Sequence, residues 1–188
     1  MNVFRSTPMT ARLAAACVLA VAAFAALPLA SAAETKAPAA TAAALPLKAP
    51  ALKLPDLKGA PQDLAQWRGR PVLLNYWATW CGPCLKELPE LEHFAQAQGK
   101  AAKGIALVGV AQDEASAANA LQARLKLSYP QLVEADGPPG SAAAFGNPGG
   151  TLPFSVLIDA KGNILDTHNG PLDAAGLARW AKLAGVAP

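Results

Sequence analysis

Three nearly continuous apolar runs divide the chain, and each has the length of a buried β-strand. They cover residues 72–77, 105–110 and 154–159, and the first is interrupted only by Asn75. Runs of this kind are typical of strands that are covered on both faces. A fourth segment, 164–167, follows the third run after a turn-forming stretch, which predicts an antiparallel hairpin. The pattern therefore predicts a β-sheet in the middle of the protein.

Apolar residues at helical spacing fill the intervals between these runs. They predict a first helix over about 82–98, with Pro89 in its interior, a second over 112–128, a short one over 141–145 and a last one over 172–185. An interior proline removes one helical hydrogen bond and bends the axis, so we expect one kinked helix at Pro89.

A short hairpin is predicted ahead of the first apolar run. Leu52, Leu54 and Leu57 alternate with polar and turn residues, and the pattern continues over 62–64 after a turn. Residues 132–133 predict one more short extended segment. In chain order the predicted core is β-α-β-α-β-β-α, without internal repeats, which places the protein in the α/β class.

The first 33 residues have the pattern of a secretory signal peptide. Arg5 and Arg12 give a positive start, an apolar stretch covers 13–27, and residues 30–32 read Ala-Ser-Ala, a typical cleavage site. We therefore expect export and removal of this segment, with the mature chain starting near Ala33. The alternative is an uncleaved membrane anchor, because the apolar part approaches the ~20 residues that span a bilayer.

Residues 34–50 are rich in Ala and Pro and have no apolar period, which predicts a disordered spacer ahead of one domain over 51–188. The formal net charge is +3, and no basic stripe with interleaved aromatic residues accompanies it. This argues against nucleic acid as a partner. The sequence shows no oligomerisation segment, and we expect a monomer.

Two of the three cysteines form a Cys-x-x-Cys pair between the first apolar run and the first helix, and Cys17 lies in the signal segment as apolar filler. A Cys-x-x-Cys at a strand-to-helix junction indicates a redox dithiol. The unpaired N–H groups and positive dipole of the helix start favour a thiolate at Cys81, which we predict to be the nucleophile. Cys84 is the resolving thiol. A structural disulfide is the alternative, but so small a loop stabilises a fold little.

The region around the cysteines resembles the active-site strand and helix of thioredoxin-fold proteins, and its details are similar to the TlpA/ResA group of bacterial extracytoplasmic thiol–disulfide oxidoreductases. The resemblance extends from about Pro50 to about Leu183. It rests most on these features: the pentapeptide Trp-Cys-Gly-Pro-Cys over 80–84, Asn75, Pro89, and Thr-Leu-Pro over 151–153. It implies a thioredoxin-like fold, a central mixed β-sheet flanked by helices, with the predicted hairpin added at the N-terminus.

Glu87 stands three residues after Cys84 and therefore projects near that thiol on the helix. Apolar neighbours would bury it in part and raise its pKa toward the working range. The resembling group has a glutamate at this place, which implies that Glu87 takes the proton of Cys84. Asn75 stands where thioredoxin has a buried aspartate, and an asparagine cannot take a proton. The alternative is that Glu87 is an ordinary solvated residue.

A substrate-binding surface is implied by the same resemblance. Pro153 corresponds to a cis-proline that faces the cysteines, and the backbone of Leu152 would pair with a bound peptide in the manner of a strand. Trp80 is expected to shield the disulfide from one side.

The resemblance also bears on the direction of the reaction. The dipeptide between the cysteines, Gly-Pro, is that of thioredoxin, whose potential is ~150 mV more reducing than that of the oxidant DsbA. We therefore predict a periplasmic reductase of disulfides in exported proteins, for example in cytochrome c maturation or copper-site assembly. The group takes its electrons from a membrane thiol–disulfide relay, which is the expected donor.

No cofactor and no metal are expected for this activity. His93 and His168 have no partners at ligand spacing, and a structural zinc site needs four ligands. A pair of thiolates does suit Cu(I), which soft sulfur ligands select. The alternative function is thus a Cu(I)-binding chaperone that uses the same dithiol.

Overall fold

A five-stranded mixed β-sheet forms the centre of this computed structural model, which describes residues 47–99 and 104–187. Its strands are β3 (Val72–Trp77), β4 (Ala106–Ala111), β5 (Gln131–Val133), β6 (Phe154–Ile158) and β7 (Ile164–Asn169). They lie in the order β5-β4-β3-β6-β7. β3 and β4 are parallel, as are β4 and β5, whereas β6 is antiparallel to both β3 and β7. The predicted mixed sheet is confirmed, with β3 as its central strand.

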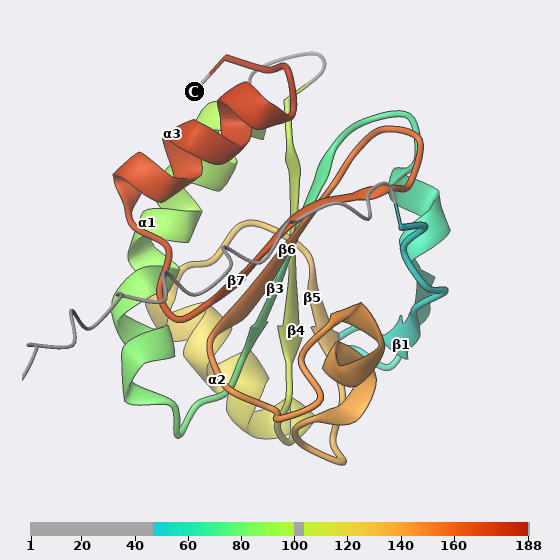
Figure 1. Cartoon of the computed structure of the whole chain (residues 1–188). Coiled ribbons are helices and arrows are strands. Elements are labelled where there is room, and N and C mark those ends of the chain that lie inside the picture. Colours follow the sequence, from blue (N-terminus) through green and yellow to red (C-terminus); the bar gives the residue numbers. More distant parts are fainter. Residues whose placement is uncertain (1–46, 100–103, 188) are drawn as a thin grey trace, which may run out of the picture. The chain divides into compact units, whose positions relative to one another are not determined.

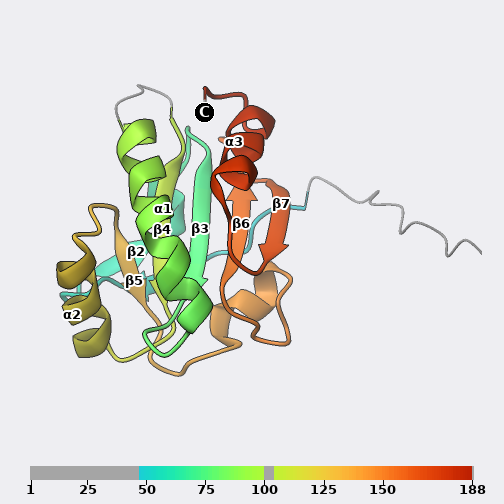
Figure 2. The same ribbon diagram turned by 90° about the vertical axis from the view of Figure 1, so that its left-hand side faces the viewer.

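Three α-helices pack on one face of the sheet: α1 (Gly82–Gly99), α2 (Ala115–Leu125) and α3 (Ala174–Leu183). Figures 1 and 2 show α1 and α3 side by side over this face. The other face receives apolar residues from the 3₁₀ helices η1 (Leu64–Trp67) and η2 (Gly140–Phe145) and from a hairpin of β1 (Lys53–Pro55) and β2 (Pro61–Asp63). The hairpin predicted at the N-terminus of the domain is therefore present.

The sheet separates two apolar clusters, as the alternation of side chains along a strand requires. Leu73 and Trp77 of β3 face the helices, and both cysteines of the Cys-x-x-Cys pair belong to this cluster. Leu74 and Tyr76 face the opposite side and join the residues of η1 and η2. All six residues of β3 are buried, which explains the unbroken apolar run that predicted the strand.

α1 is a single helix that continues through Pro89, as expected. α2 is shorter than expected, because it begins at Ala115 and ends at Leu125. It starts later because Glu114 takes the extended backbone of an N-cap residue, and the Asp113 carboxylate before it accepts hydrogen bonds from Thr79 and from the N–H of Glu114. Its end comes early because Lys126 has a left-handed backbone with φ of 55°.

α3 begins at Ala174, two residues later than expected. Asp173 is its N-cap, and the Asp173 carboxylate accepts a hydrogen bond from the backbone N–H of Gly176 at 2.8 Å. Leu172 therefore lies outside the helix, and its backbone N–H is free to bond elsewhere.

The described N-terminal segment crosses the sheet from one edge strand to the other. Lys48 forms an antiparallel bridge with Asn163, just before β7, and Asp56 forms one with Leu132 of β5. Figure 1 shows that the hairpin of β1 and β2 lies on the side of the sheet away from α1.

The predicted signal peptide and nearly all of the predicted spacer lie outside the described residues. Within 47–99 and 104–187, no helix has both the length and the apolar character that crossing a bilayer requires.

Candidate active site

A disulfide joins Cys81 and Cys84 at the point where β3 leads into α1. Cys81 precedes the first helical residue, and its Sγ accepts a hydrogen bond from the backbone N–H of Cys84 at 3.2 Å. This contact and the positive end of the α1 dipole both favour negative charge on the Cys81 sulfur. Cys84 is fully buried, whereas Cys81 keeps 5% of its surface exposed. The difference is small, and of the two residues Cys81 alone keeps exposed surface.

The loop that carries the first cysteine is held by Asp113, which follows β4. The Asp113 carboxylate accepts hydrogen bonds from both the backbone N–H and the hydroxyl of Thr79. Its other oxygen accepts the backbone N–H of Glu114 at 2.8 Å. Sequence analysis did not single out Asp113, because a polar residue between a strand and a helix is most often an ordinary cap.

Glu87 is buried, with 3% of its surface exposed, on the α1 turn that follows Cys84. Its Oε1 accepts a hydrogen bond from Nδ2 of Asn75 at 2.8 Å, and its Oε2 accepts one from the backbone N–H of Leu172 at 2.8 Å. Burial raises the pKa of Glu87 to about 7, against the lowering effect of these two bonds. The reading of Glu87 as a solvated residue is therefore wrong.

Asn75 connects the carboxylate to the sheet. Besides Glu87, its Nδ2 donates to the hydroxyl of Ser155 at 3.0 Å, and the two residues are register partners on β3 and β6. The sequence did give a signal for Ser155, because it is the single polar residue within the β6 run, as Asn75 is within the β3 run. The backbone of Leu172 gave no such signal.

Trp80 lies on the loop directly before Cys81, and Leu152 and Pro153 lie on the loop directly before β6. Trp80 is 63% exposed beside Cys81. Leu152 is half-buried and packs against the apolar cluster that contains both cysteines. The Leu152–Pro153 peptide bond is cis, and the carbonyl of Pro153 accepts the N–H of Gly170 at 2.8 Å. A second cis bond, Pro138–Pro139, was not predicted.

The segment before Pro153 is fixed by a reciprocal pair of hydrogen bonds. Nδ2 of Asn147 donates to the carbonyl of Thr151 at 2.9 Å, and the N–H of Thr151 donates to Oδ1 of Asn147 at 3.1 Å. Asn147 is buried and Thr151 is exposed, so this pair anchors the turn that leads into Leu152 to the interior.

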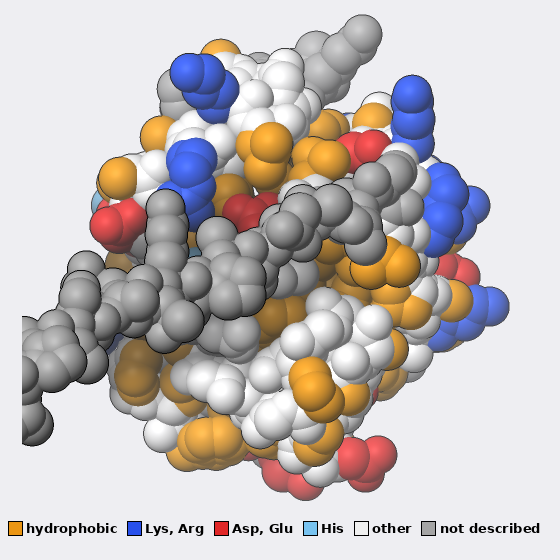
Figure 3. Space-filling view, in the orientation of Figure 1, with side chains coloured by type: hydrophobic (Ala, Val, Ile, Leu, Met, Phe, Trp, Pro, Cys, Tyr) orange, Lys and Arg blue, Asp and Glu red, His pale blue; other side chains and the backbone are white. Residues whose placement is uncertain are grey.

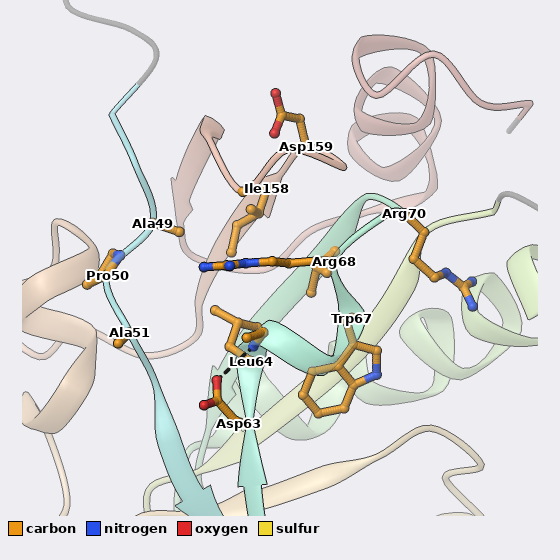
Figure 4. A pocket seen from close by; sticks show the side chains of 13 residues that line it. Ala49, Pro50, Ala51, Asp63, Leu64, Trp67, Arg68, Arg70, Ile158 and Asp159 are labelled. Atoms are coloured by element: carbon orange, nitrogen blue, oxygen red, sulfur yellow. Dashed lines mark hydrogen bonds between the residues drawn. The ribbon is translucent and has the colours of Figure 1, made fainter.

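A cavity of about 170 Å³ lies at the opposite end of β3, beside Val72 and Ile158. Figure 4 shows the side chain of Arg68 extended across it between Ile158 and Leu64. Val72 lies at the first and Trp77 at the last position of β3, five residue steps apart, or roughly 16 Å at ~3.3 Å per residue. This cavity therefore takes no part in the chemistry of the cysteines.

The surface shown in Figure 3 carries charged side chains singly and in small groups among apolar and uncharged ones. The groups around the cysteines are the apolar residues of their cluster and the hydrogen-bonded side chains of Asn75, Glu87 and Asp113. Chemically, this site can exchange a disulfide for two thiols and hold one proton on a carboxyl group nearby.

Comparisons with known proteins agree with this chemistry. A family profile described as Redoxin matches residues 32–179. The thiol-disulfide oxidoreductase ResA of Geobacillus kaustophilus is 30% identical over 126 residues, which cover 67% of this chain and 70% of the relative. A solved thiol:disulfide interchange protein of the thioredoxin family from Chlorobium tepidum TLS has a TM-score of 0.64 at 28% identity and covers 75% of this chain and 97% of its own. A secreted disulfide oxidoreductase of Mycobacterium tuberculosis has a TM-score of 0.58 at 27% identity, with 71% and 94% covered.

Proposed function

The chain belongs to the Redoxin family and is a thiol–disulfide oxidoreductase with a Cys-x-x-Cys dithiol, and from this premise we propose that it reduces disulfides in exported proteins. The observation that carries the proposal is the buried carboxyl group of Glu87 on the helix turn after Cys84. A carboxyl group whose pKa is about 7 can both take and return a proton near neutral pH.

The proposed reaction has two exchange steps. The Cys81 thiolate attacks one sulfur of the substrate disulfide, a mixed disulfide forms, and the first substrate thiolate leaves. Cys84 then gives its proton to Glu87 and attacks the Cys81 sulfur. The Cys81–Cys84 bond forms, and the second substrate thiolate leaves. Two electrons have passed from the dithiol to the substrate, and one proton has moved to Glu87.

The reductive direction is supported by the Gly82–Pro83 dipeptide between the cysteines, which is also that of the reductant thioredoxin. The cycle is completed when a thiol donor reduces the Cys81–Cys84 disulfide. We assign that role to a membrane thiol–disulfide relay, because an exported protein has no reducing pool around it. The substrates would be disulfides in proteins of cytochrome c maturation or copper-site assembly.

Export is supported by the signal-like pattern of residues 1–33 and by the relative that is described as secreted. We propose that the mature chain begins near Ala33 and acts as a monomer in the periplasm. Mass spectrometry of the exported protein tests this, and a chain that keeps residues 1–32 in the membrane fraction would contradict cleavage.

Trp80, Leu152 and Pro153 are proposed to form the substrate surface. The exposed indole of Trp80 stands beside the nucleophile, and half-buried Leu152 and buried Pro153 are placed by the Asn147–Thr151 pair of hydrogen bonds. An extended peptide that lies along Leu152 would bring its cysteine to Cys81.

Trapping tests the function directly. Cys84→Ser cannot release the mixed disulfide, so the variant expressed in the exporting cell should accumulate as covalent complexes with its substrates. Cys81→Ser is the matched control and should trap nothing. The Cu(I)-chaperone alternative is not favoured, because the relatives that match are described as oxidoreductases. Stoichiometric Cu(I) binding without any disulfide reductase activity would nevertheless overturn the proposal.

A further inference from the structure

Three buried polar atoms near Glu87 have no hydrogen-bond partner among residues 47–99 and 104–187. They are Oδ1 of Asn75, the hydroxyl of Tyr129 and Nε2 of Gln131, and each residue is at most 5% exposed. A buried polar atom without a partner costs ~1–3 kcal/mol, and most such atoms in folded proteins are bonded to protein or to ordered water. Three of them in one region call for a common partner.

The strand register places two of these residues in one row across the sheet. Asn75 on β3 is the partner of Gly109 on β4, and Gly109 is the partner of Gln131 on β5. Gly109 has no side chain, and the carboxamide of Gln131 lies over it, because a Cβ on Gly109 would come within 2.0 Å of Oε1 of Gln131. The amide of Gln131 therefore reaches toward Asn75.

The amide of Gln131 is oriented by Trp77, whose indole N–H donates to Oε1 at 2.9 Å. Nε2 of Gln131 is thus the free donor. Asn75 presents the complementary group: its Nδ2 is directed to Glu87 and to Ser155 on β6, so its Oδ1 is directed to the other side, toward β4. A free donor and a free acceptor face the same space above Gly109.

Tyr129 brings the third atom to this region. It lies two residues before Gln131 in a buried position. Burial raises the pKa of its hydroxyl, the side chain of Gln131 lowers that pKa in part, and the charges of Glu87 and Glu92 raise it further. The hydroxyl of Tyr129 therefore lies in the same region as the amide of Gln131. A hydroxyl can donate and accept at once.

We propose that Asn75, Tyr129 and Gln131 bind one buried water molecule beside Glu87, and that this water and the Tyr129 hydroxyl carry the proton of Glu87 to and from solvent. The water would donate to Oδ1 of Asn75 and to the carboxylate of Glu87, and it would accept from Nε2 of Gln131 and from the hydroxyl of Tyr129. Buried waters make about three hydrogen bonds, within a range of two to four. Tyr129 and Gln131 are then positioning residues, and this role rests on the function proposed for Glu87.

A route outward is needed because Glu87 is almost completely buried. Tyr129 supplies it, since it also lines an open hollow of about 340 Å³ together with Ser128 and Gln96. Of the other titratable groups, Cys84 lies one turn before Glu87 on α1, and Glu92 on the same helix accepts the backbone N–H of Ser128, next to Tyr129. On the side of the loop before α3, Glu87 accepts the neutral backbone N–H of Leu172. Tyr129 has its hydroxyl in the interior and also lines the hollow, so it connects the two.

Tyr129→Phe tests the proposal with the loss of a single oxygen. Tyr76→Phe is the matched control, because Tyr76 is equally buried but faces the opposite side of the sheet and bonds to Ser141. We expect Tyr129→Phe to slow resolution of the mixed disulfide roughly tenfold at neutral pH, a part of the ~10²–10⁴ that acid–base assistance supplies. Alkylation of reduced Cys81 should keep its rate in both variants.

The double variant Glu87→Gln/Tyr129→Phe separates this inference from the proposed function. If Tyr129 acts through Glu87, the second substitution adds nothing to the first. Additive losses, or a Tyr129→Phe protein that resolves the mixed disulfide as fast as Tyr76→Phe, overturn the relay and leave the role of Glu87 standing. A Glu87→Gln protein with the wild-type pH profile overturns the proposed function itself.

The water itself can be observed by NMR. In the wild type, the side-chain amide protons of Gln131 and the indole proton of Trp77 should show nuclear Overhauser contacts to a long-lived water. These contacts should weaken in Tyr129→Phe and persist in Tyr76→Phe. Amide protons of Gln131 that show no such contact in the wild type overturn the water site, whatever the kinetics.

Discussion

The carboxylate of Glu87 accepts a hydrogen bond from the backbone N–H of Leu172, 85 positions later in the sequence, at 2.8 Å. The bond ties the helix that starts at the disulfide to the loop that starts α3. It uses an N–H that Asp173, as N-cap, leaves outside the helix. Since a backbone N–H can only donate, this contact favours the ionised carboxyl group and limits how far burial raises the pKa of Glu87.

We expect Glu87→Gln to slow release of the reduced substrate by ~10²–10⁴ where proton transfer limits the rate, because the amide cannot take the proton of Cys84. Reduction of a mixed disulfide across pH 5 to 9 measures this. The wild-type profile should bend near the pKa of Glu87, about 7, and the variant should lose that bend. Glu90→Gln, on the same helix, serves as the control. Superimposable profiles for wild type and Glu87→Gln would remove Glu87 from the mechanism.

Stability should depend on pH through the same group. Below about pH 4.5 the carboxyl of Glu87 is neutral in the folded and the unfolded chain, and between pH 4.5 and about 7 only the unfolded chain ionises. The free energy of unfolding should therefore fall as the pH rises through this window and then level off. The fall is on the order of 3 kcal/mol, at ~1.36 kcal/mol per pKa unit. Urea unfolding of wild type and Glu87→Gln at several pH values measures the difference, and parallel curves would contradict it.

Cys81 should react first with an alkylating agent after reduction at neutral pH. Its sulfur accepts the N–H of Cys84 at the start of α1 and keeps some exposure, whereas Cys84 is fully buried. A thiol in such a position has a pKa of ~7 in thioredoxin against ~8.5 for a free cysteine. Peptide mapping of the singly alkylated protein identifies the labelled residue. Labelling mainly at Cys84 would reverse the order of the two exchange steps.

Gly109→Ala should destabilise the protein by ~1–3 kcal/mol, the usual range for overpacking a core. The new Cβ would lie 2.0 Å from Oε1 of Gln131 and push the carboxamide away from the indole N–H of Trp77. Gly149→Ala is the control, because a Cβ there meets nothing within 4 Å. Thermal unfolding of both variants measures the effect. Equal midpoints would show that the amide of Gln131 has room to move.

The strands and the position of the cysteine pair could be predicted from the sequence, because both depend on local patterns. The apolar run of β3 and the Cys-x-x-Cys pair after it place the cysteines at a strand-to-helix junction, and the spacing of Glu87 from Cys84 puts the acid on the next turn. These features follow from strand and helix geometry alone.

The contacts that orient Asn75, Glu87 and Gln131 could not be predicted from local sequence patterns. Ser155 bonds to Asn75 through a register that only the assembled sheet defines, and Leu172 contributes a backbone atom that no side-chain pattern reveals. In the sequence, Gln131 is a polar residue of an edge strand. Its side chain can lie over the sheet because Gly109 has no side chain to occupy that space. The start of α2 differs from the prediction for the same reason, since Asp113 bonds to Thr79, which is distant in the sequence.

The N-terminal segment that crosses the sheet has a consequence for the order in which the molecule assembles. Its anchors, Asn163 and Leu132, lie 115 and 76 residues further along the chain than Lys48 and Asp56. The part of the domain that is synthesised first thus cannot make its two bridges until β5 and then the turn before β7 have been synthesised. Once closed, it occupies backbone groups on β5 and beside β7 through which two copies of the sheet could otherwise join.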